Sequence, residues 1–118
     1  MGSGRTVLIV DDHPSFRASA RAILEADGFE VIGEATDGTS ALEMLRSLRP
    51  DVVLLDVQLP DMTGFDICEE CGDLDETAIV LVSSRDAGDY EGLIAACGAR
   101  GFIPKADLTG TAVTALVA

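Results

Sequence analysis

Short hydrophobic runs alternate along the chain with segments in which hydrophobic residues recur about every three to four positions. The runs fit parallel strands that are buried on both faces, and the spaced segments fit amphipathic helices. The predicted strands cover Thr6–Val10, Phe29–Ala35, Val52–Leu55 with Asp56 at its end, Ala78–Val82 and Arg100–Ile103. The predicted helices cover Pro14–Ala26, Ser40–Leu48, Phe65–Cys71, Asp86–Cys97 and Asp107–Ala118.

Glycine and proline residues mark the boundaries between these elements. Pro14 suits the first turn of a helix, Gly28 ends the first helix, and Pro50 prevents the second helix from continuing. Because strand and helix alternate strictly, we expect one doubly wound α/β domain. Its parallel sheet would carry helices on both faces, joined by right-handed crossovers.

The composition narrows the class of protein. A chain of 118 residues is long enough for one domain with its own core. Its 8 Lys and Arg residues against 21 Asp and Glu residues give a net charge of −13, which argues against direct binding to nucleic acid or an anionic membrane. No hydrophobic run approaches the roughly 20 residues of a membrane span. The odd number of cysteines, three, favours reduced thiols in a cytoplasm. Residues 1–4 resemble a cloning remnant, so we expect the domain to cover residues 5–118.

Polar residues follow the strands at the edge where the carboxyl ends of a parallel sheet meet. With the strand order 2-1-3-4-5, the first and third strands are neighbours at the point where ligands bind in such sheets. Asp11 and Asp12 follow the first strand and Asp56 ends the third, so we expect these carboxylates to lie together. Ser83 follows the fourth strand and Lys105 the fifth, across the same cleft.

Three carboxylates at one place require positive charge. Two carboxylates about 5 Å apart repel each other by roughly 3 kcal/mol at an effective dielectric constant of about 20. Lys105 supplies one positive charge, and oxygen ligands with room for water suit Mg²⁺. Asp56 could act as a nucleophile toward phosphorus, while Mg²⁺, Lys105 and Ser83 would stabilise the transferring group. The pattern predicts a site that receives a phosphoryl group.

Each of these residues, taken alone, has a simpler explanation. Asp56 could cap backbone amides in a turn, and Asp11 and Asp12 could cap the first helix. Lys105 could be a solvated surface lysine, and Ser83 could cap a helix. A phosphoryl-accepting site is favoured because all of them occur in order at the ends of successive strands.

The ordered set resembles the receiver domains of two-component response regulators. The resemblance covers nearly all of Arg5–Ala118 and rests on Asp11, Asp12, Asp56, Pro60, Gly64, Ser83, Phe102 and Lys105. It implies a (βα)5 flavodoxin-like, CheY-like fold. It also implies that Asp56 accepts a phosphoryl group from a sensor histidine kinase in the presence of Mg²⁺.

The resemblance assigns roles to further residues. Asp12, Asp56 and the backbone carbonyl of Gln58 would ligate Mg²⁺ directly, and Asp11 would act mainly through water. Gln58 and Arg85 occupy positions that tune hydrolysis of the acyl phosphate in the family.

The switch residues implied by the resemblance are Ser83 and Phe102. The Ser83 hydroxyl would turn toward the phosphoryl group and the Phe102 ring would follow inward. The face formed by the fourth helix, the fifth strand and the fifth helix would then change.

Two segments narrow the resemblance to the NarL/FixJ (LuxR-type) class: residues 11–17, DDHPSFR, and residues 101–108, GFIPKADL. Regulators of this class carry a C-terminal helix-turn-helix output domain that binds DNA, and no such pattern occurs here. We therefore expect an excised receiver, with a single-domain regulator as the less favoured alternative. A homodimer is possible, and the sequence does not identify its face.

Two other functions remain open. A flavin- or nucleotide-binding module could use the same fold. However, the loop Asp11-Asp12-His13-Pro14 places two negative charges, and a proline without an N–H donor, where phosphate would bind. A receiver that works through protein contact without phosphorylation would keep the fold and leave the acidic set unused.

The remaining candidate residues are interpreted as structural. Cys68 and Cys71 flank two glutamates, which disfavours an activated thiolate, and Cys97 is distant in sequence. All three cysteines are expected to be packing residues. His13 is expected to be a surface residue at the start of the first helix.

Overall fold

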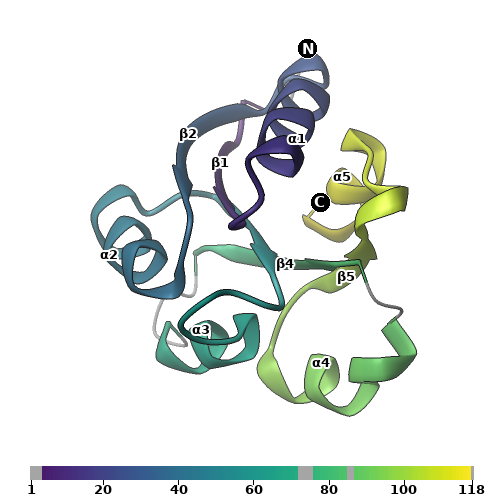
Figure 1. The fold of residues 1–118 in the computed structure, drawn as a ribbon. Coiled ribbons are helices and arrows are strands. Elements are labelled where there is room, and N and C mark those ends of the chain that lie inside the picture. Colours follow the sequence, from purple (N-terminus) through teal and green to yellow (C-terminus); the bar gives the residue numbers. More distant parts are fainter. Residues whose placement is uncertain (1–3, 72–75, 85–86, 118) are drawn as a thin grey trace.

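Five parallel strands form one sheet in the order β2-β1-β3-β4-β5, as the sequence predicted (Figure 1). The computed structural model describes residues 4–71, 76–84 and 87–117. The strands are β1 (Thr6–Val10), β2 (Glu30–Ala35), β3 (Val52–Asp56), β4 (Ala78–Ser83) and β5 (Gly101–Pro104). Every residue of β3 and β4 is buried, because these strands lie inside the sheet and are covered on both faces.

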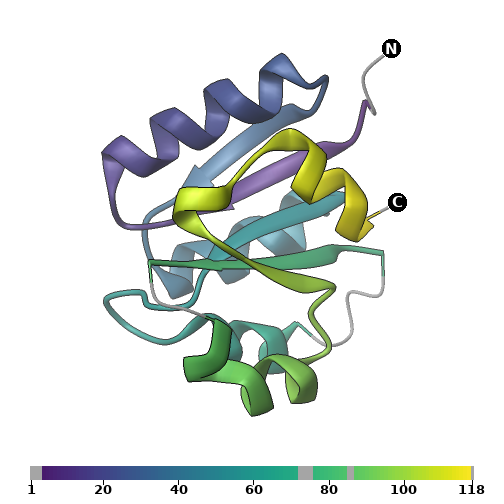
Figure 2. The same ribbon diagram turned by 90° about the vertical axis from the view of Figure 1, so that its right-hand side faces the viewer.

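Helices cover both faces of the sheet (Figures 1 and 2). The α-helices are α1 (Pro14–Ala26), α2 (Gly38–Leu48), α3 (Gly64–Glu70), α4 (Glu91–Cys97) and α5 (Gly110–Val117). Two short 3₁₀ helices, η1 (Ala87–Tyr90) and η2 (Lys105–Asp107), precede α4 and α5. In Figure 1, α1 and α5 lie on one side of the sheet, and α2, α3 and α4 lie on the other.

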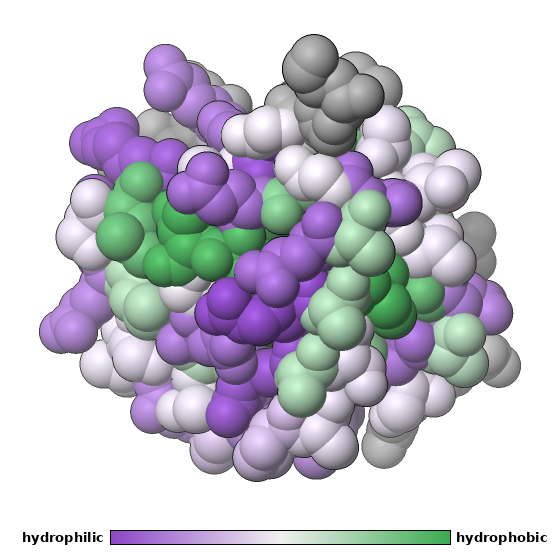
Figure 3. Space-filling model, turned by 90° about the horizontal axis from the view of Figure 1, so that it is seen from above, coloured by the Kyte–Doolittle hydropathy of each residue, from purple (hydrophilic) through white to green (hydrophobic). Residues whose placement is uncertain are grey.

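Alternating side chains of the strands divide the core into two layers. On β3, Val52 and Leu54 pack in the cluster with α1 and α5, whereas Val53 and Leu55 pack in the cluster with α2 and α3. The outer side of α1 and α5 is seen in Figure 3, where hydrophobic residues form small areas between hydrophilic ones. None of the described helices is long and apolar enough to cross a membrane.

The predicted boundaries of the last two helices were wrong. The sequence predicted one helix over Asp86–Cys97, but 3₁₀ helix η1 occupies its first described part, before α4. It also predicted a helix from Asp107, but α5 begins at Gly110, because the Thr109 hydroxyl accepts the Ala112 amide at 3.0 Å and caps the helix there.

Smaller differences occur at other ends. Helix α2 begins at Gly38 rather than at Ser40, because the side chain of Asp37 accepts the Ser40 amide at 2.8 Å. Strand β2 and strand β5 each begin one residue later than predicted, at Glu30 and Gly101, and helix α3 begins and ends one residue earlier, at Gly64 and Glu70. None of these shifts moves a candidate residue away from the carboxyl edge of the sheet.

The chain leaves β3 through a loop that returns close to the strand end. The Gly64 amide donates to the Val57 carbonyl at 2.7 Å, and the Gln58–Thr63 bridge closes the loop. A Cβ atom at Gly64 would lie 2.7 Å from the backbone oxygen of Asp56 and 3.2 Å from the Cα atom of Val57. Glycine is therefore required here for a close backbone approach, beside the residue that the sequence predicts to be the phosphoryl acceptor.

We expect Gly64→Ala to lower the free energy of unfolding by about 2 kcal/mol, because the new methyl group meets backbone atoms that cannot rotate away. Such a loss corresponds to a Tm lower by roughly 8 °C for a domain of this size. Thermal unfolding followed by circular dichroism measures it. Gly92→Ala in α4 is the control, since nothing lies within 4 Å of its new Cβ atom. Equal Tm values for the two variants would contradict the close-approach argument.

Candidate functional site

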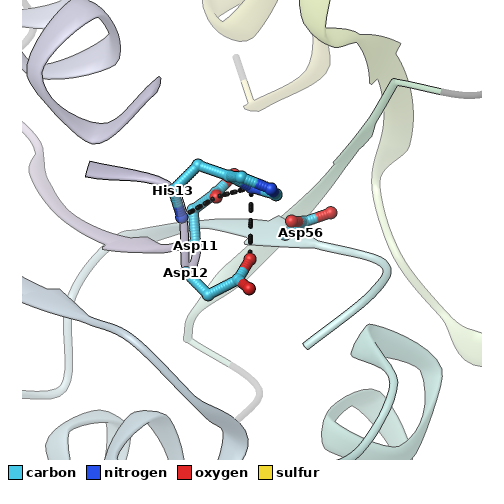
Figure 4. Close-up of side chains that lie close together, drawn as sticks. All are labelled: Asp11, Asp12, His13 and Asp56. Atoms are coloured by element: carbon cyan, nitrogen blue, oxygen red, sulfur yellow. Dashed lines mark hydrogen bonds and ion pairs between the residues drawn. The ribbon is translucent and has the colours of Figure 1, made fainter. Parts of the chain in front are cut away.

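Two buried carboxylates lie at the carboxyl ends of neighbouring strands. Val10 of β1 pairs with Leu55 of β3, so Asp11 and Asp56 leave the sheet side by side. Asp11 has an exposed fraction of 0% and Asp56 of 3%, which removes both charges from bulk water. The predicted convergence of these two residues is confirmed (Figure 4).

Lys105 forms an ion pair with each of the two carboxylates. Its Nζ atom lies 2.7 Å from Asp11 Oδ2 and 3.3 Å from Asp56 Oδ2, and the lysine side chain is only 16% exposed. The ammonium group also lies 4.6 Å from the centre of the Phe16 ring on α1, which gives it a cation–π contact. Lys105 is therefore a half-buried counter-charge and not the solvated surface lysine of the simpler explanation.

The other oxygen of each carboxylate serves the local turn. Asp11 Oδ1 accepts the His13 amide at 2.8 Å, and Asp56 Oδ1 accepts the Gln58 amide at 3.2 Å. Both aspartates thus do act as turn residues, as the simpler explanation proposed. The same turns also hold the side chains so that the Oδ2 atoms point toward Lys105.

The pKa values reflect a shortage of positive charge. Burial raises the pKa of Asp56 above its ordinary value of 3.8, and the nearby charge of Asp11 raises it further, against a lowering by Lys105. Burial acts to lower the pKa of Lys105, but its hydrogen bond to Asp11 and the charges of Asp56 and Asp11 prevail, so the pKa is raised. The lysine is held firmly protonated, and the Asp56 carboxylate remains short of neutralising charge.

Asp12 and His13 complete a cluster that could bind a metal ion. One ligand atom from each of Asp11, Asp12, His13 and Asp56 lies within 4.8 Å of all the others. The His13 side chain is 63% exposed, as a surface residue should be, but its Nδ1 atom lies 2.9 Å from Asp11 Oδ1 and 3.2 Å from Asp12 Oδ1 (Figure 4). The carboxylates fit Mg²⁺, which prefers oxygen ligands. The proximity of the His13 ring to both carboxylates was not predicted from the sequence.

The other candidate residues stand as follows. Ser83 is buried at the end of β4, one residue beyond Val82, which pairs with Asp56. Gln58 is exposed, its amide donates to Asp56 Oδ1, and its carbonyl remains only a predicted metal ligand. Arg85 lies outside the described residues.

Phe102 belongs to an aromatic cluster that the sequence did not reveal. Its ring lies 6.0 Å from that of Tyr90, which in turn lies 5.6 Å from the Phe65 ring at the start of α3. Phe102 is only half-buried, so its ring has a partly open side. Tyr90 was missed because a lone aromatic in a poorly patterned segment carries no periodic signal.

Asp61 holds the loop after β3 against the start of α2. Its carboxylate accepts the backbone amides of Gly38 at 2.7 Å and Thr39 at 3.0 Å, and also the Thr39 hydroxyl at 2.9 Å. The hydrogen bond from Gly38 is the main cause of a lowered pKa for Asp61. A contact between segments this far apart in sequence has no local pattern, so sequence reasoning could not find it.

The three cysteines are thiols and lie on the α3–α4 side of the sheet. Cys68 and Cys71 are buried and Cys97 is half-buried. Burial raises the pKa of the Cys68 thiol, which agrees with a packing role and not with an activated thiolate.

Three relatives place this arrangement among known proteins. The chain is 39% identical to the chemotaxis protein CheY of Thermotoga maritima, over 86% of each chain. It is 31% identical to the DNA-binding transcriptional activator EvgA of Escherichia coli K12, over 94% of this chain and 55% of EvgA. The signal receiver domain of the response regulator NarL from Mycobacterium tuberculosis superposes with a TM-score of 0.84, at 30% identity and 95% coverage of both chains.

The chain spans about half the length of several curated relatives that it matches. The pattern of the family described as "Response regulator receiver domain" matches residues 7–115, which is nearly the whole described fold. The expected resemblance, including that to NarL/LuxR-type receivers, is confirmed. The chain belongs to the receiver domain family of two-component response regulators.

Proposed function

We propose that Asp56 accepts a phosphoryl group from a sensor histidine kinase, with Mg²⁺ as the cofactor. The observation that carries this proposal is the pair of buried carboxylates, Asp11 and Asp56, that share Lys105. Such a site has affinity for a divalent cation and presents a carboxylate oxygen at the edge where ligands bind.

The chemistry follows from the position of each side chain. An oxygen of Asp56 attacks the phosphorus of a phosphohistidine, the P–O bond forms, and the P–N bond breaks with its electron pair leaving on the imidazole. Lys105 stays protonated and neutralises negative charge on the transferring group. Bound Mg²⁺, held by Asp11, Asp12 and Asp56, would supply further charge neutralisation. The carbonyl of Gln58 would be an additional ligand.

The proposed signal passes from Asp56 to the surface through β4 and β5. Ser83 at the end of β4 would hydrogen-bond the new phosphoryl oxygens. Phe102 on β5 would then move inward, and the change in its contact with Tyr90 would alter the face formed by α4, β5 and α5. Gln58 and Arg85 would set the lifetime of the acyl phosphate.

The proposed output is transcriptional. EvgA is a DNA-binding activator, and the chain covers only 55% of its length. We infer that this receiver controls a DNA-binding domain of a longer protein. With a net charge of −13, the receiver itself would not bind DNA.

Intact-protein mass after incubation with acetyl phosphate tests the acceptor. We expect one phosphoryl adduct on the wild-type chain in the presence of Mg²⁺, none with a chelator, and none on Asp56→Asn. Asp107→Asn, an exposed aspartate in η2, is the matched control and should still be modified. A wild-type chain that is folded and remains unmodified by acetyl phosphate and by a panel of histidine kinases would overturn the proposal.

We expect Asp56→Asn to raise the free energy of unfolding at neutral pH without metal. The raised pKa means that ionising Asp56 costs stability, a cost that is absent below about pH 3.8 and grows as pH rises through the folded-state pKa. The gain should be about 1 kcal/mol, or roughly 4 °C in Tm. It is checked by thermal unfolding with chelator at about pH 4 and about pH 7.

The same experiment has two further readouts. The gain should be larger at the higher pH, and Mg²⁺ should stabilise the wild-type chain more than Asp56→Asn. Asp107→Asn should show neither difference. A variant that is less stable than the wild type at neutral pH would show that the bond to Lys105 outweighs burial and repulsion.

Tyrosine fluorescence tests the switch. Tyr90 is the only tyrosine and the chain has no tryptophan, so the emission reports on the ring that contacts Phe102. We expect the emission to change when Asp56 is phosphorylated, and the change to be smaller in Phe102→Leu, which has no ring to stack. Unchanged emission from a fully phosphorylated wild-type chain would contradict a role for this contact.

A further inference from the structure

We propose that His13 is a direct metal ligand and gives the acidic site a preference for transition-metal ions, such as Ni²⁺ or Zn²⁺, over Mg²⁺. The inference deepens the proposed function, because it rests on the same site binding a divalent cation. It concerns which class of cation the site selects and which side chain makes the selection.

The separations around His13 Nδ1 are those of neighbouring ligands on one ion. Two ligand atoms about 2.1 Å from an ion and at right angles are about 3.0 Å apart. His13 Nδ1 lies 2.9 Å from Asp11 Oδ1 and 3.2 Å from Asp12 Oδ1. In Figure 4 the ring turns this nitrogen toward the carboxylates, with Asp56 beside them. Little movement is needed to place an ion among these atoms.

A hydrogen bond explains the approach of His13 Nδ1 to Asp11 Oδ1 at 2.9 Å. A ring nitrogen carries at most one hydrogen, so the same bond does not explain the second approach, to Asp12 Oδ1 at 3.2 Å. Asp11 Oδ1 also accepts the backbone amide of His13 at 2.8 Å. A cation between the three side chains would use one lone pair from each of them.

The backbone fixes His13 at this position. It is the N-cap residue of α1, with an extended backbone (φ −97°, ψ 109°), and its side chain makes no capping hydrogen bond. Pro14 follows and fixes the first turn of the helix. The imidazole therefore does not cap the helix. The hydrogen bond from the His13 amide to Asp11 Oδ1 holds the residue beside the acidic cluster.

The ligand set determines the preference. Carboxylates and water suit Mg²⁺, whereas imidazole suits Zn²⁺, Ni²⁺ and Cu²⁺. A neutral imidazole adds a donor atom without adding negative charge, so it contributes little to the binding of Mg²⁺. His13 should therefore raise the affinity for Ni²⁺ selectively.

Calorimetry with NiCl₂ and MgCl₂ on the untagged chain tests the proposal. His13→Asn removes the imidazole and keeps a good N-cap residue, which guards against loss of the fold. We expect the variant to bind Ni²⁺ at least about tenfold more weakly than the wild type and to bind Mg²⁺ within about twofold of it. Equal effects on the two ions, or no effect on Ni²⁺, would overturn the proposal.

The imidazole itself gives a second readout. His13 is the only histidine of the chain, so its ring proton signals in NMR spectra are unambiguous. Zn²⁺ should shift them strongly and Mg²⁺ only weakly. If Mg²⁺ binds and His13 responds to neither ion, this inference fails while the proposed function stands. If Mg²⁺ does not bind and Zn²⁺ binds through His13, the inference stands and Mg²⁺ is the wrong cofactor.

Discussion

The shared ion pair of Lys105 with Asp11 and Asp56 is the interaction on which the rest of the site depends. One positive charge lies against two buried carboxylates, so the site is not neutral. The arrangement is costly for folding, because burial and repulsion both oppose the charge on Asp56. The same imbalance favours the binding of a divalent cation, which would neutralise the excess negative charge of the cluster.

The surrounding structure holds this imbalance in place. Strand β3 is central in the sheet and fully buried, so Asp56 cannot withdraw toward water. Gly64 lets the following loop approach the Asp56 backbone, and Asp61 ties that loop to the start of α2. The Phe16 ring supports Lys105. These contacts come from different elements, so the geometry of the site is a property of the whole fold.

Hydrophobic periodicity predicted the strands and helices, and the CheY-like fold implied by the resemblance predicted the strand order. The meeting of Asp11, Asp56 and Lys105 then follows from the rule that the carboxyl ends of parallel strands share an edge. The sequence did not predict the start of α5, which depends on the cap by Thr109. It also missed the bond from Asp61 to α2 and the contact of Tyr90 with Phe102, since pairs distant in sequence leave no local signal. The sequence correctly predicted that His13 lies at the surface, but it did not predict that the Nδ1 atom lies close to both Asp11 and Asp12.

Strand β5 connects the charged site to the surface. Lys105 follows this strand and bonds the carboxylates, while Phe102 within it contacts Tyr90 on the opposite face of the sheet from Phe16. Since β5 is an edge strand, it pairs within the sheet only with β4, and a shift of it breaks fewer contacts than a shift of β3 would. A phosphoryl group on Asp56 would compete for Lys105, which follows directly after this edge strand. The charged site and the residues of the proposed switch are therefore connected through the same edge strand.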